Sequence, residues 1–176
     1  MTIAPQTKPD EVPTHTRNLN GIVVAALPVS DLARSAAWYR DLLDLDYVRE
    51  FGNDRHVTGC ALADFAAHYM IALRLRTTAQ GSPDLRGEHP IILEARDAEA
   101  TARIRDRATR LGIPHTGGRH ADGTWTEFVD PDGICLRIVH DADGPQSFIG
   151  VHTTAAGEMS FYHRPRLVLT EPIENP

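Results

Sequence analysis

Four charged residues fall inside segments that the sequence predicts to be strands: Arg74, Glu94, Glu127 and Arg137. A charged side chain on a sheet face that packs inward is costly unless it is paired or solvated. An arginine can hold a carboxylate or an enolate with two parallel hydrogen bonds, and a glutamate in a partly desolvated pocket can have a raised pKa and act as a general base. Trp125 offers a flat wall for a planar ligand. These residue types therefore indicate either acid–base chemistry on a polar ligand or internal ion pairs.

The 9 histidines and 2 cysteines are spread along the chain without a short metal-binding or nucleophile motif. There is no HExxH pattern, and Cys60 and Cys135 form no CxxC pair. Such sparing use of cysteine is typical of a protein in the reducing cytoplasm. We interpret Cys135 as a small buried hydrophobic residue, because no clear Cys–His–Asn set surrounds it.

The composition excludes several classes of protein. A chain of 176 residues is long enough for one domain. Its 18 basic and 24 acidic residues give a net charge of −6, which argues against a nucleic-acid-binding protein with a basic face. No stretch approaches the roughly 18 apolar residues of a membrane span. We therefore expect neither nucleic acid nor a membrane as a partner, and a small molecule instead.

Hydrophobic periodicity predicts the order strand–helix–strand–strand–strand twice. Asp31 and Asp97 stand where the two helices need an N-cap. The helices are predicted to run to about Leu43 and Leu111, where their apolar stripes end. Strands are predicted at 22–29, 47–51, 56–62, 68–76, 90–95, 113–116, 124–129 and 134–140, and Gly117 and Gly118 are predicted to form a loop.

This order predicts an α+β fold of two βαβββ modules. Neither half could cover its own sheet alone, so the modules should face each other as an incomplete barrel around a central cleft, with the helices outside. We expect a disordered leader at 1–18. A single domain should span 19–143, with halves at about 19–79 and 86–143, and a C-terminal extension at 144–176 should form an arm or a lid.

Two motifs carry a family resemblance. The stretch Leu27–Ser35, followed by Trp38–Leu43, resembles the opening of the vicinal oxygen chelate superfamily. The stretch Phe128–Ile138, with its Asp-Pro-Asp-Gly turn, resembles the closing hairpin of that superfamily. The superfamily includes glyoxalase I, extradiol dioxygenases, fosfomycin-resistance enzymes and bleomycin-resistance proteins. The resemblance implies the two-module fold, but one such fold hosts many functions.

The resemblance also implies a test for a metal site, because catalytic members usually bind a divalent metal through four inward-facing strand positions. These positions fall on Val24, Ala72, Pro90 and Arg137, none of which is an ordinary metal ligand. We therefore expect no metal and no other cofactor. His89 precedes Pro90 and should point to the opposite face. A divalent metal is expected only if a bulge turns His89 into the cleft.

Period-2 alternation extends this register along the strands. It places the proposed catalytic side chains Arg74, Glu94, Glu127 and Arg137 in the cleft. The expected ligand-binding residues are Val24, Met70, Ala72, Ile92, Trp125 and Cys135. The opposite parity is uniformly aliphatic and should pack under the helices. An alternative without a ligand remains, in which Arg137 pairs with Glu127 and Arg74 pairs with Glu94 across neighbouring strands.

Three functions follow from this reading. The first is a metal-independent acid–base enzyme, of isomerase, cyclase or lyase type, acting on a small polar or aromatic metabolite. In it Glu127 or Glu94 is the base, and Arg137 or Arg74 stabilises an oxyanion. The second is a non-catalytic protein that sequesters a drug or a metabolite, as bleomycin-resistance proteins do. The third is a metal-dependent enzyme, glyoxalase- or dioxygenase-like, with His89 among its ligands. We expect a homodimer in each case.

Overall fold

The structure is a computed structural model that describes residues 22–78, 81, 84–120, 123–141, 150–153 and 159–162. The predicted leader lies outside the described residues. Of the predicted C-terminal extension, only a two-stranded antiparallel hairpin is described, formed by β9 (Gly150–Thr153) and β10 (Met159–Tyr162). None of the helices in these ranges is long and apolar enough to cross a membrane.

The first module contains β1 (Val24–Val29), α1 (Leu32–Leu43), β2 (Asp46–Asn53), β3 (His56–Asp64) and β4 (Tyr69–Leu75). Its strands form one mixed sheet in the order β1-β4-β3-β2, in which β1 runs parallel to β4 and the other pairs are antiparallel. A single 3-10 turn (Arg76–Thr78) follows.

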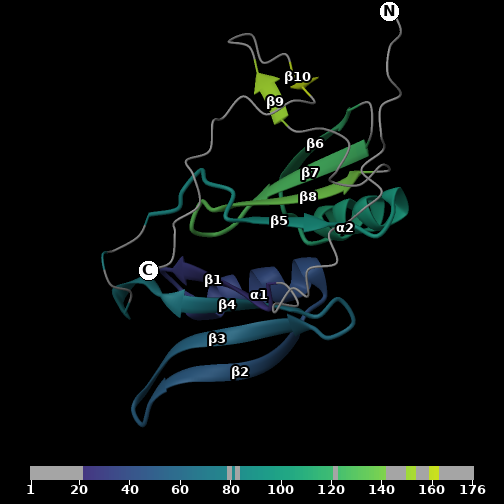
Figure 1. The fold of residues 1–176 in the computed structure, drawn as a ribbon. Coiled ribbons are helices and arrows are strands. Elements are labelled where there is room, and N and C mark those ends of the chain that lie inside the picture. The colour runs from purple at the N-terminus through teal and green to yellow at the C-terminus, as the bar shows by residue number, and fades with distance from the viewer. Residues whose placement is uncertain are drawn as a thin grey trace, which may run out of the picture.

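The second module repeats this arrangement with β5 (Ile91–Glu94), α2 (Ala98–Arg110), β6 (His115–His120), β7 (Gly123–Val129) and β8 (Cys135–Asp141). Its sheet has the order β5-β8-β7-β6, again with one parallel pair at the β5 edge. In the described part of the chain the two sheets do not join into a closed barrel (Figure 1). The predicted α+β fold of two βαβββ modules is confirmed.

Both helices begin at the predicted aspartates. The side chain of Asp31 accepts a hydrogen bond from the backbone N–H of Arg34 at 3.0 Å, and that of Asp97 accepts one from Ala100 at 2.6 Å. These bonds satisfy N–H groups that the first helical turn leaves without a partner. Helix α2 ends before Gly112, whose φ of +68° is a conformation that glycine adopts without strain.

The core follows the predicted strand alternation. One apolar cluster contains Leu27, Ile71 and Leu73 from the first sheet and Leu136 and Ile138 from the second, each almost completely buried. Their neighbours along the strands lie on the opposite face of each sheet, here called the inner face. Because the aliphatic face of each strand is covered, the inner faces are the ones left for a ligand.

The prediction for β6 was wrong. Gly117 and Gly118 do not form a loop but lie inside β6, opposite Thr126 and Trp125 of β7. A Cβ atom on Gly117 would lie 2.7 Å from the carbonyl oxygen of Trp125, so the close approach of the two strands needs glycine there. The glycine pair had the composition of a turn, but its small size serves a close contact between strands instead.

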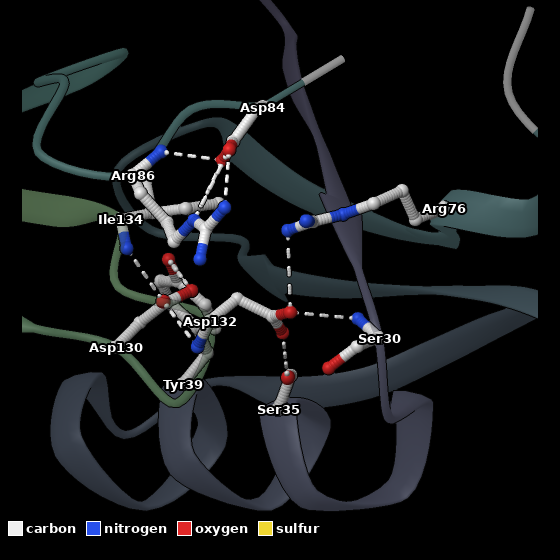
Figure 2. A network of polar contacts seen from close by, with 9 residues as sticks. All are labelled: Ser30, Ser35, Tyr39, Arg76, Asp84, Arg86, Asp130, Asp132 and Ile134. Carbon is white, nitrogen blue, oxygen red and sulfur yellow. Dashed lines mark hydrogen bonds and ion pairs between the residues drawn. The ribbon is translucent and has the colours of Figure 1, made fainter. Parts of the chain in front are cut away.

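A turn of the second module fastens the two modules together (Figure 2). Asp132, in the turn between β7 and β8, accepts hydrogen bonds from the backbone N–H of Ser30 at 2.9 Å and the hydroxyl of Ser35 at 3.3 Å. Its carboxylate also lies 3.3 Å from Nη2 of Arg76. The Asp132 side chain is only 4% exposed, so this charge depends on its partners from the first module.

Asp130, at the start of the same turn, makes a second link. It accepts a hydrogen bond from the hydroxyl of Tyr39 at 3.0 Å and two more from the backbone N–H groups of Asp132 and Ile134. Burial raises the pKa of Asp130 despite these hydrogen bonds, and burial beside Asp130 raises the pKa of Tyr39. Helix α1 of one module is therefore tied to a hairpin of the other.

Candidate functional site

Three polar side chains meet on the inner face of the second sheet. Nε2 of His89 lies 2.5 Å from Oε2 of Glu127, and Nε and Nη2 of Arg137 donate to that same oxygen at 3.1 Å and 2.6 Å. The side chains of His89, Glu127 and Arg137 are 31%, 20% and 37% exposed. They come from the segment before β5, from β7 and from β8, and we call them the His–Glu–Arg cluster.

The position of His89 corrects the prediction that it points away from the cleft. The backbone N–H of Cys135 donates to the carbonyl of Glu88 at 2.9 Å, a bond that places His89 opposite Cys135 in a parallel ladder. Ile91, however, pairs with Leu136. Two steps along one strand thus match a single step along the other, so Pro90 is one extra residue. This bulge turns His89 to the inner face.

Proline suits the place of the extra residue because it has no backbone N–H to contribute to a ladder. Pro90 is exposed, and the position that the resemblance gave it among the metal ligands is taken in space by His89. Strand alternation alone predicts the opposite face for His89 unless a bulge turns it inward, and this bulge is present. The signal was the His-Pro pair itself at the start of a strand, where a proline often accompanies a bulge.

The hydrogen-bond network fixes the tautomer of His89. A carboxylate oxygen has only lone pairs to offer, so a contact of 2.5 Å requires that Nε2 carries the proton and donates it to Glu127. Nη2 of Arg137 lies 3.3 Å from Nε2 of His89. Because both atoms are donors in this tautomer, they do not hydrogen-bond to each other. In neutral His89, Nδ1 is then the nitrogen that can accept a proton.

Glu127 remains ionised in this setting. Partial burial acts to raise its pKa, but the hydrogen bonds from His89 and Arg137 and the charge of Arg137 outweigh burial, so the pKa of Glu127 lies below its ordinary value. The sequence analysis expected a glutamate with a raised pKa. The direction is the reverse because the carboxylate has two donors beside it. A carboxylate held in this way is better suited to orient His89 than to take a proton.

Trp125 lies beside the cluster. The guanidinium carbon of Arg137 is 5.3 Å from the centre of the indole, a cation–π arrangement. On the neighbouring strand, a Cβ atom at Gly118 would lie 3.0 Å from Nε1 of Trp125, so the indole leans across a position that has no side chain. The half-buried indole and the guanidinium, which is paired with Glu127, together form a flat patch beside the cluster.

The other two charged residues lie elsewhere. Arg74 is exposed and its guanidinium carbon is 5.4 Å from the centre of the Phe51 ring, on the first sheet. Glu94 is exposed on β5, in the second sheet. Because β4 and β5 belong to different sheets, the predicted ion pair between Arg74 and Glu94 on neighbouring strands is wrong. The predicted pair of Glu127 and Arg137 is confirmed.

The residues predicted to line one cleft do not all line the same groove in the structure. A groove of about 1300 Å³ lies between the modules, and its lining includes Phe65, Tyr69, Ile92, Glu94 and Arg107 but not Glu127 or Arg137. Ile92 and Glu94 thus line this groove, and because they pair with Arg137 and Val139 they share the inner face of the second sheet with the His–Glu–Arg cluster, which the groove does not include.

The remaining predicted ligand-binding residues fall into two groups. Val24, Met70 and Ala72 lie on the inner side of the first sheet, where Val24 is 42% exposed, Met70 is half-buried and Ala72 is 5% exposed. Cys135 lies beside His89 and is 8% exposed. Burial raises the pKa of the Cys135 thiol, and the negative charge of Glu127 adds to the effect. Of all the predicted ligand-binding residues, Cys135, Trp125 and Ile92, which pairs with Arg137 across β5 and β8, lie near the cluster.

A sequence model of the Glyoxalase/Bleomycin resistance protein/Dioxygenase superfamily matches residues 21–138, which include both modules up to the middle of β8. The chain belongs to this superfamily. The match contains the His–Glu–Arg cluster and the turn that joins the modules, and it confirms the resemblance given by the two sequence motifs. A search of curated proteins finds no match.

Solved structures of the superfamily show the same fold with different activities. Lactoylglutathione lyase from Agrobacterium tumefaciens is 20% identical, with a TM-score of 0.57, and the match covers 72% of this chain and 98% of that one. An antibiotic-binding protein from Streptomyces sp. CB03234 is 20% identical, with a TM-score of 0.55 and coverage of 70% and 98%. A fosfomycin resistance protein from Listeria monocytogenes is 14% identical, with a TM-score of 0.54 and coverage of 69% and 93%. At these identities the likeness concerns the fold alone.

The metal set implied by the superfamily resemblance does not fit this chain. Val24 and Ala72 carry no donor atom, and Arg137 is a cation that holds Glu127. His89 supplies one nitrogen where Pro90 was expected. A guanidinium 2.6 Å from the nearby carboxylate provides the positive charge at this place, so the chemistry of the cluster is derived from its own side chains.

Proposed function

We propose that this member of the superfamily is a metal-independent acid–base enzyme, of isomerase, cyclase or lyase type, for a small planar metabolite that carries an acidic proton and an oxygen anion. The observation that carries the proposal is the hydrogen-bonded set of His89, Glu127 and Arg137 beside the exposed part of Trp125. Arg137 holds the carboxylate of Glu127 in place, and Glu127 accepts a hydrogen bond from Nε2 of His89. This bond orients the imidazole and leaves Nδ1 of His89 free to accept a proton.

Each residue has one role in this proposal. Nδ1 of His89 takes a proton from the ligand, and Glu127 stabilises the imidazolium that forms, as the carboxylate does in a catalytic triad. Arg137 keeps Nη1 for an oxyanion, since in the described part of the chain only its Nε and Nη2 contact Glu127 or His89. Trp125 supports the planar part of the ligand. Glu127 thus becomes a positioning residue rather than the base expected from the sequence.

The test begins with a ligand and then asks for turnover. A thermal-shift screen of small aromatic carboxylates and aromatic hydroxyketones identifies compounds that stabilise the protein. Each is incubated with the protein in deuterated water, and loss of its acidic C–H signal is followed by NMR. We expect exchange with the wild type, a loss of about 100-fold or more in Glu127→Gln with binding retained, and no loss in Glu94→Gln. Full exchange activity in Glu127→Gln would sink the assignment.

A second candidate is a protein that sequesters its ligand without turnover. It is favoured by the antibiotic-binding neighbour and by the flat patch of Trp125 and Arg137, which would bind an aromatic anion without any proton transfer. The same experiment separates the two candidates. A ligand that binds at the cluster and is recovered unchanged and undeuterated after long incubation supports sequestration.

We also propose that the protein is a homodimer in the reducing cytoplasm. The inner faces expose apolar side chains, among them Val24 at 42% and Ile92 at 55%, which a second copy would cover. Cys60 and Cys135 are both free thiols, as expected in a reducing compartment. Light scattering that finds only monomer at micromolar concentration would contradict the dimer.

A further inference from the structure

A second set of donor atoms overlaps the His–Glu–Arg cluster. One nitrogen of His89, one carboxylate oxygen of Glu127 and the sulfur of Cys135 all lie within 4.8 Å of one another. The three residues stand on three neighbouring backbone segments, the bulge before β5, then β8, then β7. Cys135 occupies the middle segment, so its short side chain forms the floor between the two longer ones.

The thiol of Cys135 takes part in no hydrogen bond and no disulfide in the described part of the chain. The residue is 8% exposed, none of the described residues makes a hydrogen bond to its sulfur, and it is a free cysteine. Its neighbour on the same face of β8 is Arg137, which is committed to Glu127. The nearly buried sulfur, the imidazole nitrogen and the carboxylate oxygen together form a set of one soft, one intermediate and one hard donor atom. Such a set is typical of zinc and unlike the all-oxygen sets of magnesium and calcium.

We propose that His89, Glu127 and Cys135 form a binding site for a thiophilic divalent metal ion such as Zn²⁺, and that this ion competes with Arg137 for Glu127. Two of the three ligands differ from the positions that the superfamily resemblance implies. The proposal goes beyond the acid–base function and does not depend on it, because binding of the ion requires only the donor atoms.

The geometry needs a small rearrangement of the donor atoms. Bonds of about 2.0–2.3 Å to a tetrahedral zinc ion place the donor atoms roughly 3.5 Å apart. All three donors lie within 4.8 Å of one another, but Nε2 of His89 and Oε2 of Glu127 are only 2.5 Å apart, so these two must separate by about 1 Å to admit the ion. Glu127 can do this by turning away from Arg137, whose side chain is 37% exposed and can move into solvent. The thiol proton leaves to solvent when the Zn–S bond forms, so binding strengthens as pH rises.

Competition follows from charge. Arg137 and the ion are both cations and both bind the carboxylate of Glu127, so each weakens the other. With the ion bound, one nitrogen of His89 is taken by the metal and Glu127 no longer accepts a hydrogen bond from His89. Zinc should therefore oppose any ligand that uses His89 and Arg137, rather than assist it.

The test uses cobalt(II) as a probe, because a thiolate–cobalt bond gives a near-ultraviolet charge-transfer band that histidine and carboxylate ligands do not give. The purified full-length protein is titrated with Co²⁺ and then with Zn²⁺. We expect the band to appear with wild type, to be removed by Zn²⁺, and to be absent in Cys135→Ser. The matched control is Cys60→Ser, which changes the buried cysteine of the first module and should keep the band.

Arg137→Met provides the second measurement and does not depend on the fold of a cysteine variant. Removing the competing cation should tighten Zn²⁺ binding by roughly tenfold or more, measured by calorimetry. A band that persists in Cys135→Ser, no band in wild type, or equal or weaker zinc affinity in Arg137→Met overturns the proposal. None of these readouts requires turnover. A failure of the acid–base function would therefore not contradict the metal site, and a failure of the metal site would not contradict the acid–base function.

Discussion

The two modules have the same order of elements and the same sheet topology, but their inner faces differ. On the second sheet, His89, Glu127 and Arg137 hydrogen-bond to one another. On the first sheet, the inner face carries Val24 and Ala72, and its arginine, Arg74, is exposed over an aromatic ring without a carboxylate partner among the described residues. A duplicated backbone thus provides two equivalent inner faces, and within the described part of the chain only that of the second sheet carries a polar cluster.

The hairpin turns of the two modules differ as well. The turn between β7 and β8 reaches the other module through Asp132 and Asp130. The turn between β3 and β4 is exposed, with Phe65 67% accessible, and among the described residues its aspartate, Asp64, bonds only to the backbone of its own turn. The second module therefore supplies both the cluster and this link between the modules, and the first module supplies the groups that the link contacts.

The largest expected effect separates the two turns. Asp132→Ala removes the acceptor for Ser30 and Ser35 and leaves Arg76 without its carboxylate, so the free energy of unfolding should fall by about 2–4 kcal/mol. Asp64→Ala removes two exposed hydrogen bonds and should cost about 1 kcal/mol or less. Urea denaturation of both variants measures the difference. Equal losses in the two variants would show that the contacts of Asp132 with the first module do not stabilise the protein more than the local hydrogen bonds of Asp64 do.

The next prediction compares the two arginines. Arg137→Met should weaken binding of an aromatic carboxylate by about 10- to 100-fold, the usual loss for a charged hydrogen bond of 1.5–3 kcal/mol. Arg74→Met, in which the lost cation also lies over an aromatic ring, should change the affinity by less than about threefold, because exposed cation–π contacts contribute little. Calorimetry with one ligand on both variants checks this. A larger loss in Arg74→Met would move the site to the first module.

Much of the fold could be predicted from the sequence because its signals are local. The caps at Asp31 and Asp97, the aliphatic alternation at Ile71 and Leu73, and the Asp-Pro-Asp-Gly turn all act within a few residues. The pairing of Glu127 with Arg137 was also within reach, because both strands of that hairpin were assigned correctly and the turn set their register.

The errors arose where position depends on another strand. Whether His89 points inward depends on one extra residue at Pro90 relative to β8, and sequence alternation alone gives the opposite face. The ion pair of Arg74 and Glu94 failed because sequence cannot say which strands share a sheet. The pKa of Glu127 falls rather than rises partly for the same reason, since one of its two donors, His89, reaches it only through the bulge at Pro90.

Two inner-face glycines offer a smaller contrast. Each lies beside an aromatic ring that stacks on an arginine: Gly59 beside Phe51, and Gly118 beside Trp125. A Cβ at Gly59 would lie 2.7 Å from the carbonyl oxygen of Leu73, which is backbone and cannot move aside, so Gly59→Ala should cost about 1–3 kcal/mol.

In Gly118→Ala the nearest atom belongs to the half-buried side chain of Trp125, at 3.0 Å, and the indole can shift. The stability loss should stay below about 1 kcal/mol, but the tryptophan fluorescence and the affinity for an aromatic ligand should both change. Thermal unfolding and a fluorescence titration measure these effects. Unchanged fluorescence together with unchanged affinity would show that Gly118 does not set the position of the indole.

The smallest effect concerns the pH dependence of the cluster. The pKa of Glu127 in the folded protein lies below its ordinary value, so its ion pair stabilises the fold fully above the unfolded pKa of about 4.3 and loses this contribution as pH falls through the folded pKa. Wild type should thus exceed Glu127→Gln in stability by about 1 kcal/mol near pH 5, and by less near pH 3. The exposed Glu94, in Glu94→Gln, should show no such trend. Urea denaturation at both pH values measures this difference in the free energy of unfolding. If the difference grew as the pH fell, the fold would be stabilised more by protonated than by ionised Glu127, and the role given to its carboxylate would be wrong.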